Sequence, residues 1–536
     1  MSTTRLRHIA FYAVLLLLPL LAAFPLWGPG MVNTRGGGDS PFLLQRTLDM
    51  ADNLRHGIFP VRWMAHAAYD LGYPFFNHYA ALPFYLSGGL TALGVSSILA
   101  IQATQTFGFI LAALTVALWA RRVYRKPQAT LLAVAAYTFA PFHLVNVYVR
   151  GDSLSEFYAF IWYPLILWAL DRAAERYTPW RVMLAALSYA ALLLTHNVSA
   201  LIFAPFALLY ALLQQVGVSA RQSEHGARTG ALYFTSSVFR SATPFLLAFL
   251  ITAWFWVPAI GETGYGQMGP EFTAGYFHYS NHFRGLNLVQ RSFLFDYAVA
   301  GEAGVAGPFV MGLVQTVLAL LGVGMLVWRI VKAKRRQHEM SGPENRNLDS
   351  VVRLSSTIHY AFILFGFCLS TFMITPLSSW LWEHLPLLEV TQFPWRFLSV
   401  QALFVALATA AIAGESENGQ NTRLARRLSH SIRLVWRSAR FAVPLLLVVL
   451  AALGSLHPER LWITSEDVTW DNLLLYEAFT GNIGTTIRYE YLPADVKPRL
   501  YISESVVDGV DMAKPIAGNG AALTATLLKR APNRQE

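Results

Sequence analysis

The sequence predicts an all-α protein that crosses a membrane many times. Three observations support this prediction: an apolar composition, apolar runs that recur at the length of a membrane span, and basic residues that gather in alternate connections. Of the 536 residues, 55% are hydrophobic and 13% are charged, and the mean hydropathy is +0.41. Soluble domains carry about 25% charged residues, so the composition indicates an integral membrane protein.

Apolar runs of about 17 to 25 residues, long enough to cross a hydrocarbon core about 30 Å thick, predict about 11 to 13 transmembrane helices. We expect the first run to be a retained span rather than a signal peptide, because it lacks a small-residue cleavage pattern. Cys368 is the single cysteine, which excludes a disulfide within the chain and a cysteine metal cluster. The predicted spans cover residues 8–27, 97–120, 129–148, 156–172, 181–195, 199–215, 241–258, 306–329, 355–373, 396–413 and 441–455.

The net charge of +10 is concentrated in short connections between these spans. By the positive-inside rule such connections are cytoplasmic, so the charge indicates an orientation in the cell membrane rather than binding of nucleic acid. The N-terminus is then cytoplasmic and the C-terminal tail exoplasmic. The basic runs are Arg5 with Arg7, and residues 121–126, 332–336 and 423–440.

The predicted domains are a transmembrane domain, residues 1–455, and a small exoplasmic tail, residues 456–536. Residues 28–96 form a first outer loop and residues 259–305 a second, long one. The tail is expected to be β-rich, because stretches such as RLYISESVV alternate in polarity. Every motif that could perform chemistry falls on this outer side.

Asp39 is the first candidate catalytic residue. It follows three glycines and precedes Ser40 and Pro41, a pattern typical of a helix start with proline at the first helical position. The carboxylate is either a helix cap or an ionised group that accepts a proton from a hydroxyl. In the second case it could also bind a divalent cation, with Mg or Mn as the candidate cofactor.

Two further segments of the first outer loop border the membrane. Leu43, Thr47, Met50 and Leu54 lie at helical spacing, which predicts an amphipathic helix along the membrane surface. Residues 79–95 are apolar enough to enter the bilayer, but a full crossing would place the basic run at 121–126 outside. We therefore expect a re-entrant or interfacial segment with irregular backbone near its proline and its two glycines.

A second motif, RGDSLSE, contains Arg150, Asp152 and Glu156 at the outer end of a predicted span. Ser153 and Glu156 match a capping box, which would make the glutamate structural. Alternatively, Asp152 or Glu156 is a second catalytic carboxylate. Arg150 either pairs with these carboxylates or contacts an anionic ligand.

The remaining candidates are predicted to bind substrate. A His-Asn pair interrupts two spans and could bind a sugar or phosphate, or form a plain polar turn. The spacing of His278 and His282 would place both on one helix face as metal ligands, or they belong to an aromatic belt. Arg396 suits a lipid phosphate or is a snorkelling arginine. The predicted binding residues are His78, Arg150, His196, Asn197, Glu262, His278, His282, Trp395 and Arg396.

Assembled in order, these motifs resemble the bacterial membrane proteins labelled 6-pyruvoyl-tetrahydropterin synthase-related, which look like GT-C glycosyltransferases. The matching pieces are GGGDSPF, LGYPFFNHYAALPFYL, VRGDSLSEFYAF, LTHN, WFWVPAIGE, QFPWRFL and EAFTGNIGTTIRYEYLP. The resemblance implies a GT-C fold, a polyprenyl-phosphate sugar as donor, and Asp39 at the active site. The pterin label finds no support in the residues, because the three-histidine zinc site of a soluble pterin synthase has no counterpart.

The predicted function is therefore transfer of a sugar from a polyprenyl-phosphate donor to a glycan, lipid or protein acceptor on the non-cytoplasmic face, with inversion. The alternatives are a non-catalytic transporter or flippase, and an assembly factor for lipid-linked glycans. A transporter predicts ionisable residues inside the spans and related halves. The predicted spans are poor in such residues, which favours an enzyme.

Overall fold

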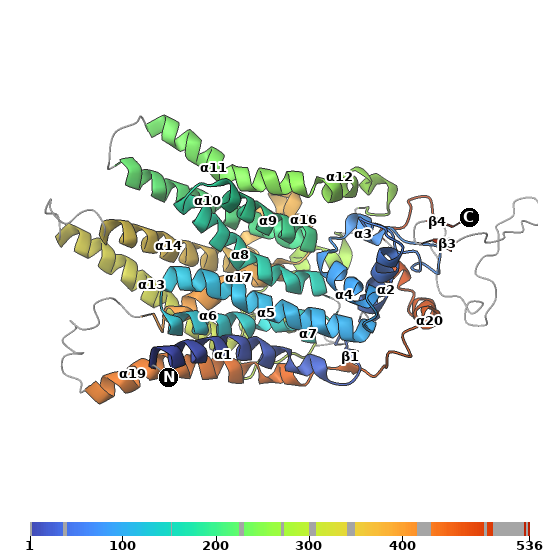
Figure 1. Ribbon diagram of the computed structural model, residues 1–536, viewed down its shortest axis with the longest axis horizontal. Helices are drawn as coiled ribbons and strands as arrows, with labels where there is room; N and C mark the ends of the chain where they lie inside the picture. The colour runs from blue at the N-terminus through green and yellow to red at the C-terminus, as the bar shows by residue number, and fades with distance from the viewer. Residues whose placement is uncertain are drawn as a thin grey trace, which may run out of the picture.

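The protein is described by a computed structural model that is mostly helical (Figure 1). The described residues are 3–35, 40–151, 153–223, 230–269, 273–299, 307–339, 349–414, 430–486, 490–496, 530–531 and 534–535.

Six helices are long and apolar enough to cross a membrane. Two further candidates are bent pairs, α6 Pro127–Thr138 with α7 Pro141–Tyr148 at 40°, and the end of α11 Gly230–Ile251 with α12 Ala253–Gly261 at 70°. Counting each pair as one span gives eight, so the predicted number of about 11 to 13 is not confirmed. The six are α1 Thr3–Ala23, α5 Ser97–Tyr124, α10 Asn197–Ser223, α13 Leu313–Glu339, α14 Asp349–Ile374 and α19 His430–Ala451.

The other predicted spans also form helices, namely α8 Leu154–Glu175, α9 Pro179–Thr195 and α17 Phe397–Ala410. Every residue of α17 is buried, as is every residue of α7. A helix that is apolar on all sides belongs in the interior of a bundle. The outer helices α1, α13 and α19 instead expose large apolar side chains, as expected of helices that face lipid.

Short helices and loops gather at one end of the bundle, which we call the loop end (Figure 1). They include α2 Pro41–Arg55, α3 Phe75–His78, α4 Leu82–Ala92 and α20 Trp470–Thr480. Here β1 Met31–Val32 pairs antiparallel with β2 Arg460–Leu461, so segments from the first and last parts of the sequence lie side by side. The opposite end, where α5 and α8 finish, is called the basic end.

Short elements complete the described chain. They are η1 Phe24–Trp27, η2 Thr263–Tyr265, η4 Gly275–Phe277, η5 Tyr279–His282, η7 Pro376–Ser378, α15 Ser379–His384, α16 Pro386–Glu389, η8 Pro394–Arg396, η9 Leu453–Leu456, η10 Ile483–Thr485, β3 Arg530–Ala531 and β4 Arg534–Gln535.

Helix α2 begins at Pro41 as predicted, but it is not an amphipathic surface helix. Leu43, Thr47 and Met50 of the predicted stripe are buried and Leu54 is partly buried, but Arg46 and Asp49, which lie off the stripe, are buried as well. The reason is that α4 packs on one side of α2, and parts of residues 64–73 and 470–484 cover another. Helix α2 is therefore the centre of the loop end.

The expected irregular backbone at 79–95 is wrong, because α4 runs through Pro83, Gly88 and Gly89 as a regular helix. Its 11 residues span about 16 Å, about half the thickness of a hydrocarbon core. A Cβ atom on Gly88 would lie 2.4 Å from Cγ of Met50, so this glycine permits the close packing of α4 on α2.

The predicted β-rich tail is not confirmed in the part of the chain that the structure describes. Residues 470–480 form α20, and β2, β3 and β4 contain two residues each. The alternating stretches at 499–507 and 521–529 lie outside the described residues. Strand β2, helix α20 and residues 490–496 of the tail pack on the loop end.

Candidate functional site

The segments that carry the predicted catalytic carboxylates meet at the loop end. Asp39 and Asp152 themselves lie outside the described residues. Thr34 donates from its backbone N–H to Ser40 Oγ at 2.6 Å, and its hydroxyl donates to the carbonyl of Arg150 at 3.1 Å. Gly151 has φ +55°, and a Cβ atom there would lie 2.6 Å from Ser40 Oγ. Ser40 and Gly151, the sequence neighbours of the two aspartates, are therefore in close contact.

Arg150, Glu156 and Arg396 form a buried ionic cluster beside this contact. Arg150 donates to Glu156 Oε2 and, at 2.9 Å, to Asn146 Oδ1. Nε of Arg396 lies 4.0 Å from the same glutamate oxygen, and its Nη1 donates to the carbonyl of Thr391 at 2.8 Å. Glu156 lies in α8, Arg396 in η8 and Arg150 two residues after the end of α7, so three separate segments supply this cluster with two guanidinium groups and one carboxylate.

Two alternatives left open by the sequence are wrong. Ser153 makes no side-chain hydrogen bond to the start of α8, and Glu156 pairs with Arg150, so the capping box does not form. Arg396 does not snorkel, since its side chain is 12% exposed and points inward to Glu156. Glu156 and Arg396 therefore both belong to the ionic cluster.

The acceptor Glu156 Oε1 and the donor Asn146 Nδ2 of this cluster are buried and have no hydrogen-bond partner within the described residues. Buried polar atoms are nearly always bonded to protein, water or a ligand. The cluster can therefore still accept one hydrogen bond and donate another.

Trp395, Phe309 and Phe393 cover one side of the cluster, which we call its aromatic side. The Trp395 ring lies 5.3 Å from the Arg150 guanidinium and stacks on Phe309 and Phe393, at 4.3 and 4.8 Å between centroids. A guanidinium over an indole face is held flat by a cation–π interaction. The tryptophan therefore orients Arg150 and excludes water from one side of it.

His196 and Asn197 occupy the turn between α9 and α10. The imidazole Nδ1 accepts from the backbone N–H of Ser199 at 3.3 Å, and burial lowers the pKa of His196 to about 4, so the ring is neutral. Asn197 Nδ2 donates to the backbone carbonyl of His78 at 3.1 Å. This turn therefore links the ionic cluster to the first outer loop.

His78 and Glu262 lie on the other side of that turn. His78 contacts the carbonyl of Ala259 through Nδ1 at 3.1 Å, and burial lowers its pKa. Asn77, next in the chain, donates to Glu262 Oε2 at 2.8 Å. The His78 ring also stacks on Tyr491 with centroids 5.2 Å apart.

The helical pairing predicted for His278 and His282 is wrong, because residues 279–282 form the short 3₁₀ helix η5. His282 contacts the carbonyl of Tyr276 and packs edge-on against Phe393, 4.6 Å between centroids, so it borders the aromatic side of the cluster. His278 contacts Ser280 instead, at 2.7 Å. Among the residues that the structure describes, no group of three His, Cys, Asp or Glu side chains is arranged to hold a metal ion.

Sequence reasoning missed Asn146, Phe309 and Tyr491. Asn146 could have been found, since it is a buried amide four residues before Arg150, the spacing of helical neighbours. Nothing local identifies Phe309 or Tyr491, because their contacts come from distant parts of the chain.

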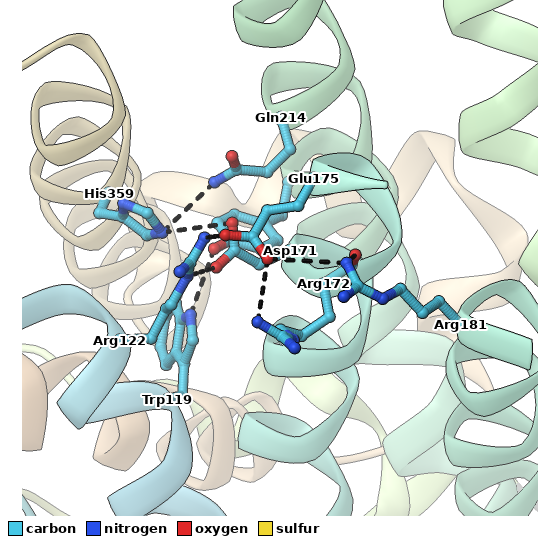
Figure 2. A network of polar contacts seen from close by, with 9 residues as sticks. Trp119, Arg122, Asp171, Arg172, Glu175, Arg181, Gln214 and His359 are labelled. Carbon is cyan, nitrogen blue, oxygen red and sulfur yellow. Dashed lines mark hydrogen bonds and ion pairs between the residues drawn. The ribbon is translucent and has the colours of Figure 1, made fainter. Parts of the chain in front are cut away.

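A second ionic network, also missed, lies at the basic end around the buried side chains of Asp171 and His359 (Figure 2). Arg122, predicted to be a loop anchor, lies in the last turn of α5 and pairs with Asp171 and Glu175 of α8. His359 of α14 lies 3.8 Å from the other Asp171 oxygen. Arg172 and Arg181 approach the other Glu175 oxygen at 3.0 and 3.7 Å, and so complete the contacts of both carboxylates.

No family model matches the chain, so the resemblance to the pterin synthase-related proteins and to GT-C enzymes stays a prediction. A relative from Lactococcus lactis subsp. cremoris (strain MG1363), described as uncharacterized, is 23% identical over 206 residues, which is 38% of this chain and 33% of the relative. The chain thus matches about a third of that relative's length.

Two solved structures of oligosaccharyltransferases from Archaeoglobus fulgidus are similar in part. One is AglB in complex with an inhibitory peptide and a dolichol-phosphate, with a TM-score of 0.46 and 15% identity over 86% of this chain and 57% of that one. The other, in complex with Zn and sulfate, has a TM-score of 0.43 and 16% identity over 84% and 53%. This chain spans little more than half of each, and at these TM-scores the likeness carries no argument about activity.

Proposed function

We propose that this protein transfers a sugar from a polyprenyl-phosphate donor to an acceptor hydroxyl at the loop end, on the exoplasmic face of the membrane. One observation supports the proposal most directly: the buried Arg150–Glu156–Arg396 cluster, with one acceptor and one donor atom open. A sugar phosphate has the complementary groups, hydroxyls that donate and phosphate oxygens that accept.

The two arginines are the groups that would bind the phosphate. A guanidinium matches phosphate oxygens with paired N–H donors, and such charge-assisted bonds are about twice as strong as neutral ones. Trp395 beside Arg150 keeps water from one face, which strengthens the attraction. In this arrangement Glu156 holds the arginines and accepts a sugar hydroxyl, so it acts in binding rather than as an acid or base.

Asp39 is the proposed base, with Asp152 as its neighbour in the site. The contact of Ser40 with Gly151 supports this assignment, because each is adjacent in sequence to one of these aspartates. Asp39 removes the proton from the acceptor hydroxyl as its oxygen bonds to the anomeric carbon. The bond from that carbon to the phosphate oxygen breaks, and the lipid phosphate leaves with its electron pair, with inversion at the carbon.

Neutralisation of the leaving phosphate by Arg150 and Arg396 is the larger catalytic contribution, as is usual for preorganised charges. The acceptor is a glycan, lipid or protein hydroxyl. Asp39 and Asp152 are the residues that would hold a divalent cation such as Mg or Mn, which would help to neutralise the leaving phosphate. The exoplasmic placement rests on the basic residues at the opposite end of the bundle.

The test is transfer of radiolabelled sugar from a panel of polyprenyl-phosphate donors by the purified full chain in nanodiscs. Asp39→Asn is expected to lose about 10² to 10⁴ in rate, the usual contribution of a general base. The matched control is Asp471→Asn on the exposed first turn of α20. Both variants must first bind polyprenyl phosphate equally well.

Equal rates for Asp39→Asn and the control would overturn the base assignment. Absence of transfer by the unaltered protein across the panel, together with movement of a lipid-linked sugar across liposomes, would replace the enzyme by a transporter. Neither transfer nor transport would leave the assembly-factor alternative. Inhibition by a chelator, restored by Mg or Mn, would add a metal to the site.

A further inference from the structure

The motif YEAFTGNIGTT, residues 476–486, is not used by the proposed chemistry, yet its glutamate is completely buried. Glu477 Oε1 accepts from the backbone N–H groups of Ala68 at 3.1 Å and Gly484 at 2.9 Å, and Oε2 accepts from Tyr69 N–H at 2.8 Å. Gln45 Nε2 of α2 donates to Oε1 at 3.3 Å. One carboxylate of the tail thus fastens the first outer loop and α2.

The loop segment that Glu477 holds is strained. Ala68, Tyr69 and Asp70 have φ values of 56°, 57° and 62°, so three successive residues other than glycine are left-handed. This conformation is unfavourable for a residue with a Cβ atom, because the Cβ approaches the following carbonyl oxygen. Strain of this kind persists only where surrounding contacts impose it, and it clusters at functional sites. Two of the three residues donate their N–H groups to Glu477, so its carboxylate is the contact that holds the turn.

Tyr73, three residues after this turn, makes the next contacts between the first outer loop and the tail. Its hydroxyl lies 2.8 Å from Thr486 Oγ1 and accepts from the backbone N–H of Tyr491 at 3.0 Å. Gly484 has φ +65°, and a Cβ atom there would lie 2.5 Å from the Tyr73 ring. A glycine is therefore required at position 484 for the two segments to approach this closely.

The same tail segment then reaches the candidate site. Tyr491 stacks on His78, which accepts a hydrogen bond from Asn197 at its carbonyl. Leu492 accepts from the N–H of Gln267, and Ala494 donates to the carbonyl of Tyr265, so the segment also binds the second outer loop.

We propose that residues 470–486 and 490–496 form a clamp that fixes His78 at the edge of the site, and that Glu477 is the positioning residue of this clamp. The carboxylate imposes the left-handed turn, the turn places Tyr73, and Tyr73 with Tyr491 places His78. The role of His78 beside a donor sugar rests on the proposed function, whereas the clamp itself does not.

The experiment is amide hydrogen exchange of the full chain in nanodiscs, comparing Glu477→Gln with Glu466→Gln. Glu466 is an exposed acid four residues before the clamp begins, so its variant removes a carboxylate without touching the clamp. Glu477→Gln is expected to raise exchange at residues 68, 69 and 484, and also at 77 and 78, by about tenfold or more, because lost protection reports local opening. Glu466→Gln is expected to change none of these.

Faster exchange confined to residue 484, or equal exchange in both variants, would overturn the clamp. If Glu477→Gln does not fold, Tyr491→Leu serves as the second variant. It leaves the carboxylate in place, so faster exchange is expected at 77 and 78 but not at 68 and 69. No change at 77 and 78 would again overturn the proposal.

A kinetic measurement separates this proposal from the proposed function. With a polyprenyl-phosphate sugar donor, Glu477→Gln is expected to raise KM about tenfold with little change in kcat, as when a binding group is displaced. A fall in kcat alone would contradict the positioning role at the site. Absence of transfer by the unaltered protein would defeat the proposed function, while the exchange result would still decide the clamp.

Discussion

The two ends of the bundle each contain an ionic network around a buried carboxylate, Asp171 at the basic end and Glu156 at the loop end, and the networks differ in completeness. At the basic end, both oxygens of Asp171 and both oxygens of Glu175 face a cationic group or an imidazole (Figure 2). At the loop end, the described residues engage one Glu156 oxygen and leave an N–H of the Asn146 amide open. The same residue types thus make a closed network in one place and an open one in the other.

The difference shows what each network is suited to do. A closed network connects α5, α8, α9 and α14 and offers no free carboxylate oxygen to a ligand. An open network leaves buried polar atoms without partners, and each such atom costs about 1 to 3 kcal/mol until something bonds it. We interpret the closed network as a structural tether and the open one as a binding site.

The largest expected effect is on stability at the basic end. Asp171→Asn should lower the free energy of unfolding by about 3 to 5 kcal/mol, because Arg122 and His359 would lose their buried partner. Unfolding by SDS titration measures this, with Asp471→Asn as the control for an exposed acid. A loss no larger than that of the control would mean that the network does not tether the helices.

The next effect is on ligand affinity at the loop end. Arg396→Gln should weaken binding of polyprenyl phosphate by about 10 to 100-fold, since a hydrogen bond to a charged group contributes about 1.5 to 3 kcal/mol. Arg122→Gln, at the other end, should leave the affinity unchanged. A binding titration with polyprenyl phosphate, and with the uncharged polyprenol for comparison, separates the phosphate from the lipid tail. Equal losses in the two variants would remove the distinction between the networks.

The helices were predictable because apolar runs of span length report the burial of their residues. All the predicted spans coincide with helices or bent pairs, and the break between α6 and α7 falls at Pro141. The number of spans was not predictable, since interior helices such as α17 are enclosed by protein rather than lipid. Length and polarity alone do not separate these two surroundings.

The site was predictable only where its parts are close in sequence. Arg150 and Glu156 lie in one motif, and their pairing follows from that. The contact of Arg396 with the same glutamate joins two segments that are distant in sequence. Arg46 and Asp49 lie off the apolar stripe of α2, so periodicity predicts that they are exposed, and nothing local indicates which segments cover them. Their cover includes the tail, from the other end of the chain. The function of Glu477 was invisible for the same reason.

Asp49 sharpens the comparison, because it is another buried carboxylate with an open oxygen. Oδ1 accepts from the backbone N–H of His66 at 3.1 Å, and Oδ2 has no partner within the described residues. Unlike Glu156, it forms no ion pair with an arginine or lysine in the described chain, and burial raises its pKa well above the usual value of 3.8. The raised pKa favours a protonated, neutral Asp49, whereas Arg150 and Arg396 favour an ionised Glu156.

The folded protein therefore keeps the proton of Asp49 at pH values above 3.8, where the unfolded chain has released it. Stability from this proton is complete below about pH 3.8 and is lost as pH rises toward the raised pKa of Asp49, at about 1.4 kcal/mol for each pH unit. Asp49→Asn, which cannot titrate, should flatten this decline when unfolding is measured from pH 4 to pH 8.

Asp52, Asp70, His66 and Glu477 face the same region, so Glu477→Gln is the comparison that isolates the share of Asp49 in the slope. An unchanged slope in Asp49→Asn would place the titrating group elsewhere. A flattened slope would show that an open carboxylate without a cation holds a proton, which leaves Glu156 as the carboxylate ready for a ligand.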